Sequence, residues 1–338
     1  MIEAPALEPP WASHFSEKLF VFMSRVPSAP PLEILVGPTP VQGLKDDAGR
    51  VTSRRRSMVR AFLELSKPGV TRLVLVTTAL GVLAAPSGFE WLDLWATMVG
   101  TALVVAGANA LNMFVERESD AFMTRTRTRP LPTGRLSADE ALAFGVLVSI
   151  AGLFILAQFV SGLAVGLAAF ALLSYVLLYT PLKRVHSIAL YVGAVPGALP
   201  PAIGYAAVTG TLDGVGLYLF LILLVWQLPH FLAISLFRRD EYARAGLRVL
   251  PNERGERYTK WTALAQSILL LLVTLLPVRH AGISPVYAWV AAVSGLLFIL
   301  MAAVGLRADS GDAWARRFFF SSMPHLVIVM SALVLCVH

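Results

Sequence analysis

The chain is poor in charged residues. Only 14% of its 338 residues are Asp, Glu, Lys or Arg, whereas 57% are hydrophobic. An average soluble domain has about 25% charged and about 45–50% apolar residues, so this composition excludes an ordinary globular enzyme. It also excludes disorder for most of the chain. The single cysteine, Cys336, cannot form an internal disulfide. These absences indicate an integral membrane protein, and we expect an all-α, polytopic fold.

Acidic residues are scarcer than basic ones, which leaves a net charge of +7. A basic balance can indicate a nucleic-acid partner, but here the Lys and Arg residues lie between long apolar runs. We therefore expect this chain to lie in the lipid bilayer and to have no nucleic-acid partner.

Nine apolar runs approach the length of about 20 residues that a spanning helix needs. The fifth contains Pro196, Pro200 and Pro201 and is expected to be kinked or broken. Ser137 and Glu140 have the spacing of a capping box and predict where the third begins. The nine predicted spans are Val70–Ala85, Trp91–Val115, Ser137–Phe159, Gly162–Thr180, Ile188–Val208, Val215–Phe237, Thr259–Pro277, Pro285–Gly305 and Phe318–Val337.

The basic residues predict the orientation of these spans. On a nine-span arrangement, 26 of the 28 Lys and Arg residues fall on one side of the membrane. Because basic residues accumulate on the cytoplasmic side, this predicts a cytoplasmic N-terminus. Residues 1–57 hold eight of the 21 prolines and are expected to form a disordered cytoplasmic extension, followed by a nine-helix domain over 58–338.

A polar stripe is predicted where the second span meets the cytoplasm. Asn112, Glu116 and Asp120 are spaced four residues apart and share one face of a helix. Their oxygen atoms suit Mg²⁺, which is often shared with phosphate. The arginines that follow match phosphate geometry, namely Arg125, Arg127, Arg129 and Arg135. This pattern favours a metal–diphosphate site over a helix that merely ends in charged residues, because acids contribute little to topology.

A second polar cluster follows the sixth span on the same predicted side. It pairs acids with arginines and is preceded by His230 in a Trp-Gln-Leu-Pro-His-Phe segment. Two such clusters facing each other could hold two metal ions, or one metal with two anchoring points. The residues of this cluster are Arg238, Arg239, Asp240, Glu241, Tyr242 and Arg244.

Four stretches together resemble the UbiA-type intramembrane prenyltransferases, specifically the protoheme IX farnesyltransferase (heme O synthase) branch. They are LSKPGV (65–70), NALNMFVERESDAFMTRTRTRPLPTGRLS (109–137), YTPLKRVHSIALYVGAVPGALPPAIGYAAVTG (179–210) and WQLPHFLAISLFRRDEYARAGLRVLP (226–251). The resemblance covers about residues 60–338. It implies a UbiA-type helical bundle in the inner membrane of a bacterial cell, with the active-site loops in the cytoplasm.

The resemblance also implies the chemistry. Farnesyl diphosphate and heme b are the expected substrates, heme O and diphosphate the products, and Mg²⁺ the cofactor; a heme A synthase is a candidate partner. The residues that match the family's metal-binding and catalytic positions are Asn112, Glu116, Asp120, Asp240 and Glu241. Those that match substrate-binding positions are Arg125, Arg127, Arg129, Lys183, Arg184, His230, Arg238, Arg239 and Tyr242.

The chain departs from the family pattern at several positions. Glu241 stands where the family usually has Asp, and a Glu can still bind a metal. Ala189 aligns with a usual Asn, and Arg248 adds a charge where the family commonly has I-P-M-L-P. The departures at Ala189 and Arg248 leave room for altered substrate preference. The alternatives are another UbiA-type enzyme that prenylates an aromatic acid or a chlorophyllide, a secondary transporter with a broken fifth span, and a non-catalytic scaffold for cofactor assembly.

Overall fold

Helices make up the regular structure of the chain. The structure is a computed structural model that describes residues 58–86, 88–279, 282–307 and 309–337, and no β-strand occurs in these ranges. The predicted extension 1–57 lies outside the described residues. Residues 58–65 are helical and lead into α3 (Pro68–Leu83). The predicted all-α fold is confirmed for the part of the chain that is described.

Among the described residues, eight helices are long and apolar enough to cross a membrane. Three of them continue beyond the predicted ends: α4 (Trp91–Asp120), α12 (Glu256–Leu275) and α14 (Asp312–Cys336). The others are α5 (Ala138–Phe159), α8 (Ala189–Thr209), α9 (Gly214–Phe237), α13 (Pro285–Val304), and the continuous run Gly162–Leu182, formed by α6 (Gly162–Leu173), the π-helical η1 (Ser174–Tyr179) and α7 (Thr180–Leu182).

The first predicted span is the short one. Helix α3 has 16 residues, which at about 1.5 Å per residue gives a length of about 24 Å. The hydrocarbon core of a bilayer is about 30 Å thick. The described residues therefore contain eight full-length apolar helices and this shorter one, and the count of nine spans stays a prediction.

The proline-rich fifth span is not broken. Helix α8 runs without interruption through Pro196, Pro200 and Pro201, all of which are buried. Prolines in a membrane helix are tolerated where neighbouring helices cover the backbone groups that they leave unpaired. Helix α8 packs against α3, α4, α6 and α9. Of the expected kink or break, the break does not occur, because this helix is enclosed by others.

Helices α8 and α9 form the interior of the bundle. In their apolar windows 72% of the residues are buried, compared with 22% in α5 and in the run Gly162–Leu182. The outer helices expose large apolar side chains such as Leu147, Phe154 and Leu300. Together these features describe a membrane-spanning protein whose outer surface suits lipid.

Helices α3 and α8 cross at very close range. A Cβ atom added to Gly204 would lie 2.0 Å from the Thr78 carbonyl oxygen, and one added to Gly81 would lie 2.0 Å from the Pro201 carbonyl oxygen. Small residues permit such approaches in membranes, where packing replaces the hydrophobic driving force. This crossing fixes α3, and with it the segment just before α3, against the centre of the bundle.

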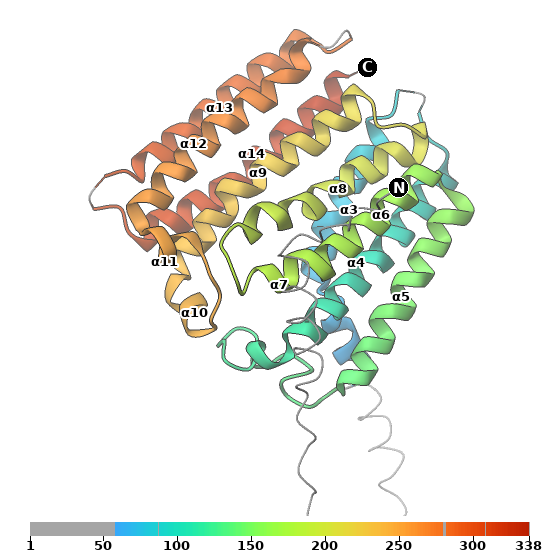
Figure 1. The fold of residues 1–338 in the computed structure, drawn as a ribbon. Helices are drawn as coiled ribbons and strands as arrows, with labels where there is room; N and C mark the ends of the chain where they lie inside the picture. The colour runs from blue at the N-terminus through green and yellow to red at the C-terminus, as the bar shows by residue number, and fades with distance from the viewer. Residues whose placement is uncertain (1–57, 87, 280–281, 308, 338) are drawn as a thin grey trace, which may run out of the picture. The chain divides into compact units, whose positions relative to one another are not determined.

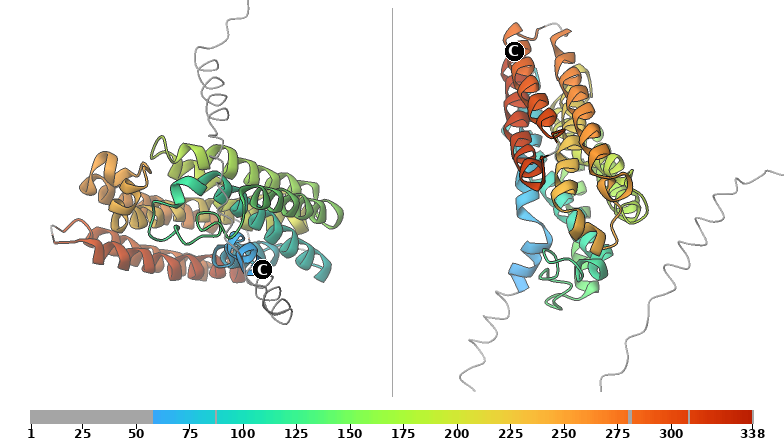
Figure 2. Two further views of the ribbon diagram at one scale, coloured as in Figure 1. Left: turned by 90° about the horizontal axis from the view of Figure 1, so that it is seen from below. Right: turned by 90° about the vertical axis from the view of Figure 1, so that its left-hand side faces the viewer.

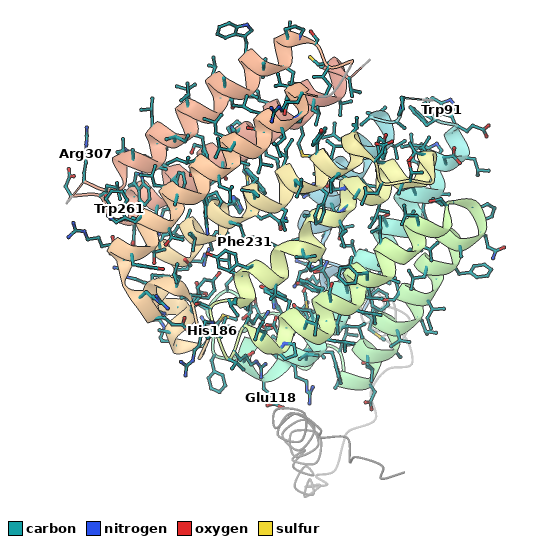
Figure 3. The ribbon with its side chains drawn as sticks, turned by 45° about the horizontal axis from the view of Figure 1, so that its top comes forward. Trp91, Glu118, His186, Phe231, Trp261 and Arg307 are labelled. Carbon is teal, nitrogen blue, oxygen red and sulfur yellow. The ribbon has the colours of Figure 1, made fainter. Side chains whose placement is uncertain are left out.

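The polar segments of the bundle gather at one end. Figure 1 shows α7, α10 (Arg239–Arg244) and the segment that follows α4 at the same end of the helices, and Figure 2 shows the helices lying alongside one another from two further directions. In Figure 3, Glu118 and His186 lie at this end, whereas Trp91, the first residue of α4, lies at the other. The backbone confirms the approach of two of these segments, because the Arg248 N–H donates to the Lys183 carbonyl at 3.3 Å.

Candidate active site

The predicted polar stripe lies on the last turns of α4 and is buried. Asn112 and Asp120 are each 1% exposed and Glu116 is 5% exposed. Helix α4 continues to Asp120, five residues past the predicted end of the apolar run, so that all three residues share one helical face. Buried carboxylates require partners because desolvating a lone charge is costly.

Cationic side chains from two loops provide these partners. Arg129, in the loop after α4, lies 2.6 Å from Asp120 Oδ2. Lys183, directly after α7, forms an ion pair with Glu116 Oε1. The Asn112 amide donates to Thr180 Oγ1 at 3.0 Å. The structure therefore brings together the stripe and two of the predicted basic residues.

Lys67 is a member of this site that the sequence did not single out. Its ammonium donates to Asn112 Oδ1 at 3.2 Å. Burial lowers the pKa of Lys67 to about 7; the positive charges of Arg129 and Lys183 act in the same direction, and Glu116 and Asp120 oppose it. Within the described residues it is the one non-glycine residue with a positive φ, at 44°. Strained backbone of this kind concentrates at functional sites.

A weak signal for Lys67 was present in the sequence. It belongs to the LSKPGV stretch (65–70), and Pro68 follows it. The proline disfavours the right-handed helical conformation at the preceding residue, and at position 67 the backbone adopts the left-handed one. Only the packing of α3 reveals that this turn directs the amine toward α4.

The second cluster splits into an inward and an outward half. The side chain of Glu241 is 14% exposed and lies 2.7 Å from Arg238 NH1. Although burial acts to raise it, the pKa of Glu241 is lowered, because Arg238 and Arg125 stabilise the carboxylate. Arg125 belongs to the loop after α4, so the two predicted clusters do meet at this point.

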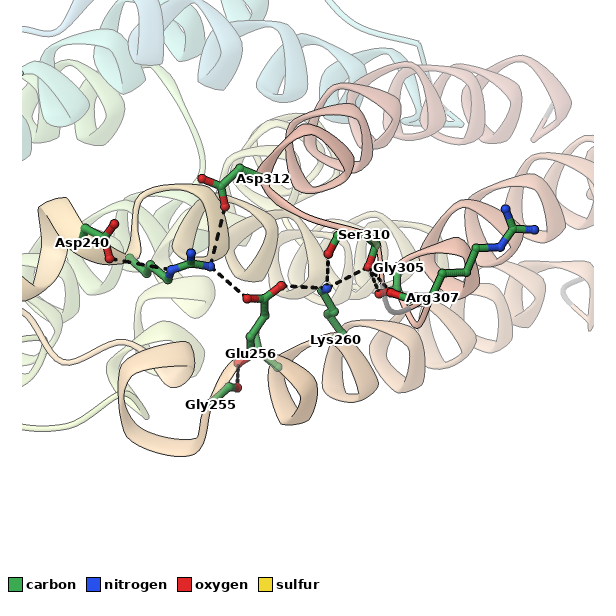
Figure 4. A network of polar contacts seen from close by, with 10 residues as sticks. Asp240, Gly255, Glu256, Lys260, Gly305, Arg307, Ser310 and Asp312 are labelled. Carbon is green, nitrogen blue, oxygen red and sulfur yellow. Dashed lines mark hydrogen bonds and ion pairs between the residues drawn. The ribbon is translucent and has the colours of Figure 1, made fainter.

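The outward half of the second cluster forms a different network (Figure 4). The side chain of Asp240 is 82% exposed and lies 3.7 Å from Arg239. Arg239 in turn contacts Glu256 at 3.0 Å and Asp312 at 3.7 Å. Glu256 is also 2.7 Å from Lys260, a buried residue that donates to Ser310. This network connects α10 with the beginnings of α12 and α14 and makes no contact with the α4 stripe.

The remaining predicted residues lie at the edge of the site. Arg184 donates to the Val115 carbonyl at 3.3 Å and to Ser119 Oγ at 3.0 Å, so it braces α4. Arg127 is exposed. Burial raises the pKa of Tyr242, and the charge of Arg125 opposes that rise. Because Arg125 must be close to act in this way, Tyr242 lies beside the point where the two clusters meet.

His230 lies deeper in the bundle, on α9, and is 7% exposed. Its ring packs 4.6 Å from that of Trp226 and 4.5 Å from that of Phe319 on α14. Its Nδ1 is 2.7 Å from Ser322 Oγ. These contacts turn His230 toward α14, and no described contact joins it to the α4 stripe.

Two carboxylate oxygens at the site are suited to a cation. Asp120 Oδ1 and Glu241 Oε1 are buried and have no hydrogen-bond partner, which is costly unless a further group binds them. In the part of the chain that is described, no three His, Cys, Asp or Glu side chains are already gathered as a metal-binding group. The donor atoms present are oxygens, which fit Mg²⁺ with phosphate as an additional ligand.

An apolar cavity of about 130 Å³ adjoins the stripe. It lies between α3, α4, the run Gly162–Leu182 and α8, and Asn109 and Tyr175 are among its lining residues. Tyr175 stacks on Tyr179 at 5.3 Å, and the Lys183 ammonium lies 5.0 Å from the centre of the Tyr179 ring. Through Asn109, three residues before Asn112 on α4, and through Tyr175, the cavity lies next to the charged residues.

The fold and this site define a class of protein: a membrane-spanning helical bundle in which an acidic stripe, paired with Lys and Arg, lies near an apolar cavity. The family model of the UbiA prenyltransferase family matches residues 73–323. The chain belongs to the UbiA prenyltransferase family, which confirms the resemblance seen in its sequence.

Two similar proteins carry the same name. The chain is 50% identical over 238 residues, covering 70% of this chain and 85% of the relative, to a protoheme IX farnesyltransferase of Sorangium cellulosum. It is 44% identical over 274 residues, covering 81% of this chain and 93% of the relative, to the protein of the same name from Myxococcus xanthus.

Solved structures agree on the fold. A digeranylgeranylglyceryl phosphate synthase is similar with a TM-score of 0.72 and 20% identity, covering 83% of this chain and 98% of that one. A UbiA homolog from Archaeoglobus fulgidus bound to GPP and Mg²⁺ is similar with a TM-score of 0.62 and 13% identity, covering 81% of this chain and 99% of that one. At these identities the likeness concerns the fold alone.

Proposed function

We propose that the chain transfers the farnesyl group of farnesyl diphosphate to a vinyl group of heme b, giving heme O and diphosphate. The observation that carries this proposal is the ring of Lys67, Arg129 and Lys183 around a buried acidic stripe, next to an apolar cavity. The names of the relatives support heme b as the acceptor. They favour it over an aromatic acid or a chlorophyllide.

The basic residues hold the diphosphate as a leaving group. The bond between the first farnesyl carbon and the diphosphate oxygen breaks, and its electron pair leaves on the diphosphate. Preorganised cations aimed at developing negative charge stabilise such a transition state, most effectively where water is excluded. Arg129 and Lys183 already lie against carboxylates, which keeps both side chains in place before the substrate arrives.

Asn112, Glu116, Asp120 and Glu241 are the residues that we propose to hold Mg²⁺. Asp120 and Glu241 each contribute a buried oxygen without a partner. When bound, Mg²⁺ supplies positive charge that neutralises the diphosphate. Asp240 is left out of this set because its side chain is exposed and paired with Arg239.

The apolar cavity serves the other end of the substrate. Its lining, which includes Val74, Val104 and Leu172, offers the prenyl chain a surface without water. A vinyl carbon of heme b forms the new carbon–carbon bond with the first farnesyl carbon. A water oxygen then adds to the other vinyl carbon and loses a proton, which gives the hydroxyethyl group of heme O.

We further propose that the chain lies in the inner membrane of a bacterial cell with the site at the cytoplasmic side. This placement is supported by the distribution of Lys and Arg, which is heaviest in the segments that carry the site. A heme A synthase that oxidises the product stays an expected partner.

The test is product analysis with the purified full chain in lipid nanodiscs. Heme b, farnesyl diphosphate and Mg²⁺ should give a product with the mass of heme O. Asp120→Asn should abolish diphosphate release, whereas Glu118→Gln, which alters an exposed acid on the same helix, should retain it. Prenylation of an aromatic acid in place of heme would refute the proposed acceptor, and full activity of Asp120→Asn would refute the proposed role of Asp120. Absence of any product from the wild-type protein would favour a scaffold over an enzyme.

A further inference from the structure

Aromatic rings from two helices form a column beside the site. Trp226, His230 and Phe237 lie on α9, and Phe319 lies on α14. The His230 ring is 4.5 Å from Phe319, and the Phe319 ring is 5.9 Å from Phe237, edge to face. From His230 to Phe237 the chain advances seven residues, about 10 Å along the helix. The column therefore runs from the interior of the bundle to the end that carries the charged residues.

Hydrogen bonds fix the tautomer of His230 at the inner end of this column. Ser322 Oγ donates its only proton to the Phe319 carbonyl at 2.6 Å. The contact of 2.7 Å between Ser322 Oγ and His230 Nδ1 must then be a bond in which Nδ1–H donates. The lone pair of His230 therefore lies on Nε2, the nitrogen with which a neutral imidazole binds a metal when its other N–H is anchored.

Two arginines close the outer end of the column. The guanidinium of Arg238 lies 5.7 Å from the centre of the Phe237 ring, and that of Arg316 lies 5.4 Å from it. Arg238 also pairs with Glu241 and so borders the proposed diphosphate site. Arg316 is exposed, and among the ion pairs of the described residues it has no carboxylate partner.

We infer that Arg316, together with Arg238, binds the two carboxylates of a flat dianionic macrocycle that lies along this column. This inference rests on the proposed function, in which that molecule is heme b. The column then offers one group to each part of the molecule: Nε2 of His230 to the iron, Phe319 and Phe237 to the apolar ring, and the two guanidinium groups to the propionates. Because Arg238 borders both sites, this placement brings the macrocycle next to the farnesyl diphosphate.

The experiment measures heme binding separately from activity. Purified full-length protein in detergent, without added lipid or farnesyl diphosphate, is titrated with ferric heme, and binding is followed by the Soret band. Arg316→Gln should weaken binding about tenfold, the typical effect of losing one charge-assisted hydrogen bond. Arg317→Gln, which changes the adjacent exposed arginine, should leave binding unchanged.

The dimethyl ester of heme supplies the decisive comparison. It lacks the propionate charges, so the wild-type protein and Arg316→Gln should bind it equally, which also shows that the variant is folded. His230→Ala should alter the spectrum of bound heme, whereas Arg316→Gln should not. A tenfold difference that persisted with the ester would show that Arg316 does not act on the propionates, and the absence of any difference with heme itself would show that Arg316 does not bind it. Either result overturns the inference.

Failure of the inference can be told apart from failure of the proposed function. If the wild-type protein produces heme O and binds heme, but Arg316→Gln binds it as tightly as Arg317→Gln, only the role of Arg316 is refuted. If the wild-type protein binds no heme at all, both are refuted.

Discussion

Replacement of Lys67 by glycine and by alanine separates the two roles of this position. Lys67 has a left-handed backbone conformation, with φ 44° and ψ 67°, which costs a residue with a Cβ atom about 1–2 kcal/mol. Glycine carries no such cost. We therefore expect Lys67→Gly to be more stable toward unfolding than Lys67→Ala by about 1 kcal/mol, although neither variant retains the amine.

The activity of both variants should fall together. The Lys67 ammonium donates to Asn112 Oδ1 at 3.2 Å and lies among the cations that face the proposed diphosphate. Loss of a charge-assisted hydrogen bond costs about 1.5–3 kcal/mol. This corresponds to a decrease in kcat/KM of about 10- to 150-fold. The loss should be equal in the two variants because both lack the same group.

Two measurements check this pair of variants. Thermal unfolding of the purified proteins in one detergent gives the difference in stability, and release of diphosphate from farnesyl diphosphate in the presence of heme b gives kcat/KM. If Lys67→Gly kept the wild-type kcat/KM, the amine would have no part in the reaction. If alanine were as stable as glycine at this position, the strain inferred from the backbone would be absent in solution.

Further predictions concern the second cluster, the helix crossing and pH. Glu241→Gln should lower the rate of diphosphate release at least tenfold, whereas Asp240→Asn should leave it within twofold, and equal effects of the two would contradict the inward and outward division. Gly204→Ala should destabilise the protein by about 1–3 kcal/mol in a chemical unfolding experiment, because its Cβ meets the Thr78 carbonyl, and unchanged stability would contradict the close crossing. The Arg135 hydrogen bond holds the pKa of Glu64 below its ordinary value of 4.5 against the opposing effect of burial, so this carboxylate stabilises the fold above that pH. Glu64→Gln should accordingly lower the Tm at pH 7, by the equivalent of about 1 kcal/mol or less. The difference should fade as the pH falls from 4.5 through the lowered pKa of Glu64, and a difference that persisted in full at the lowest pH would exclude the ion pair as its cause.

The sequence predicted the helices well where length and composition decide the structure. Apolar runs of about 20 residues have one stable form in a bilayer, and the capping box of Ser137 and Glu140 is present as predicted. Prediction from the sequence failed where the packing of helices against one another decides the structure. The prolines of α8 suggested a kink or a break, and burial among four helices excludes the break by keeping that helix continuous.

For the candidate site as well, features set by a single helix could be predicted, whereas contacts between elements could not. The spacing of Asn112, Glu116 and Asp120 is a property of any helix, so their shared face followed from the sequence. The choice between Asp240 and Glu241 did not, because adjacent residues in a six-residue helix differ only in which neighbours they meet. Lys67 was missed for a similar reason, since only the crossing of α3 and α8 brings it toward the stripe.

The direction of α4 has a consequence for the protein without its substrates. The peptide dipoles of its 30 residues add up to a partial negative charge at its carboxyl end, where acidic side chains are normally unfavourable. Glu116 and Asp120 occupy that end, so the helix itself intensifies the negative potential at the stripe. Arg129 and Lys183 therefore serve as resident counter-ions that offset this potential. In the proposed reaction, binding of Mg²⁺ with the diphosphate is an exchange of counter-ions, which frees the two basic side chains for the leaving group.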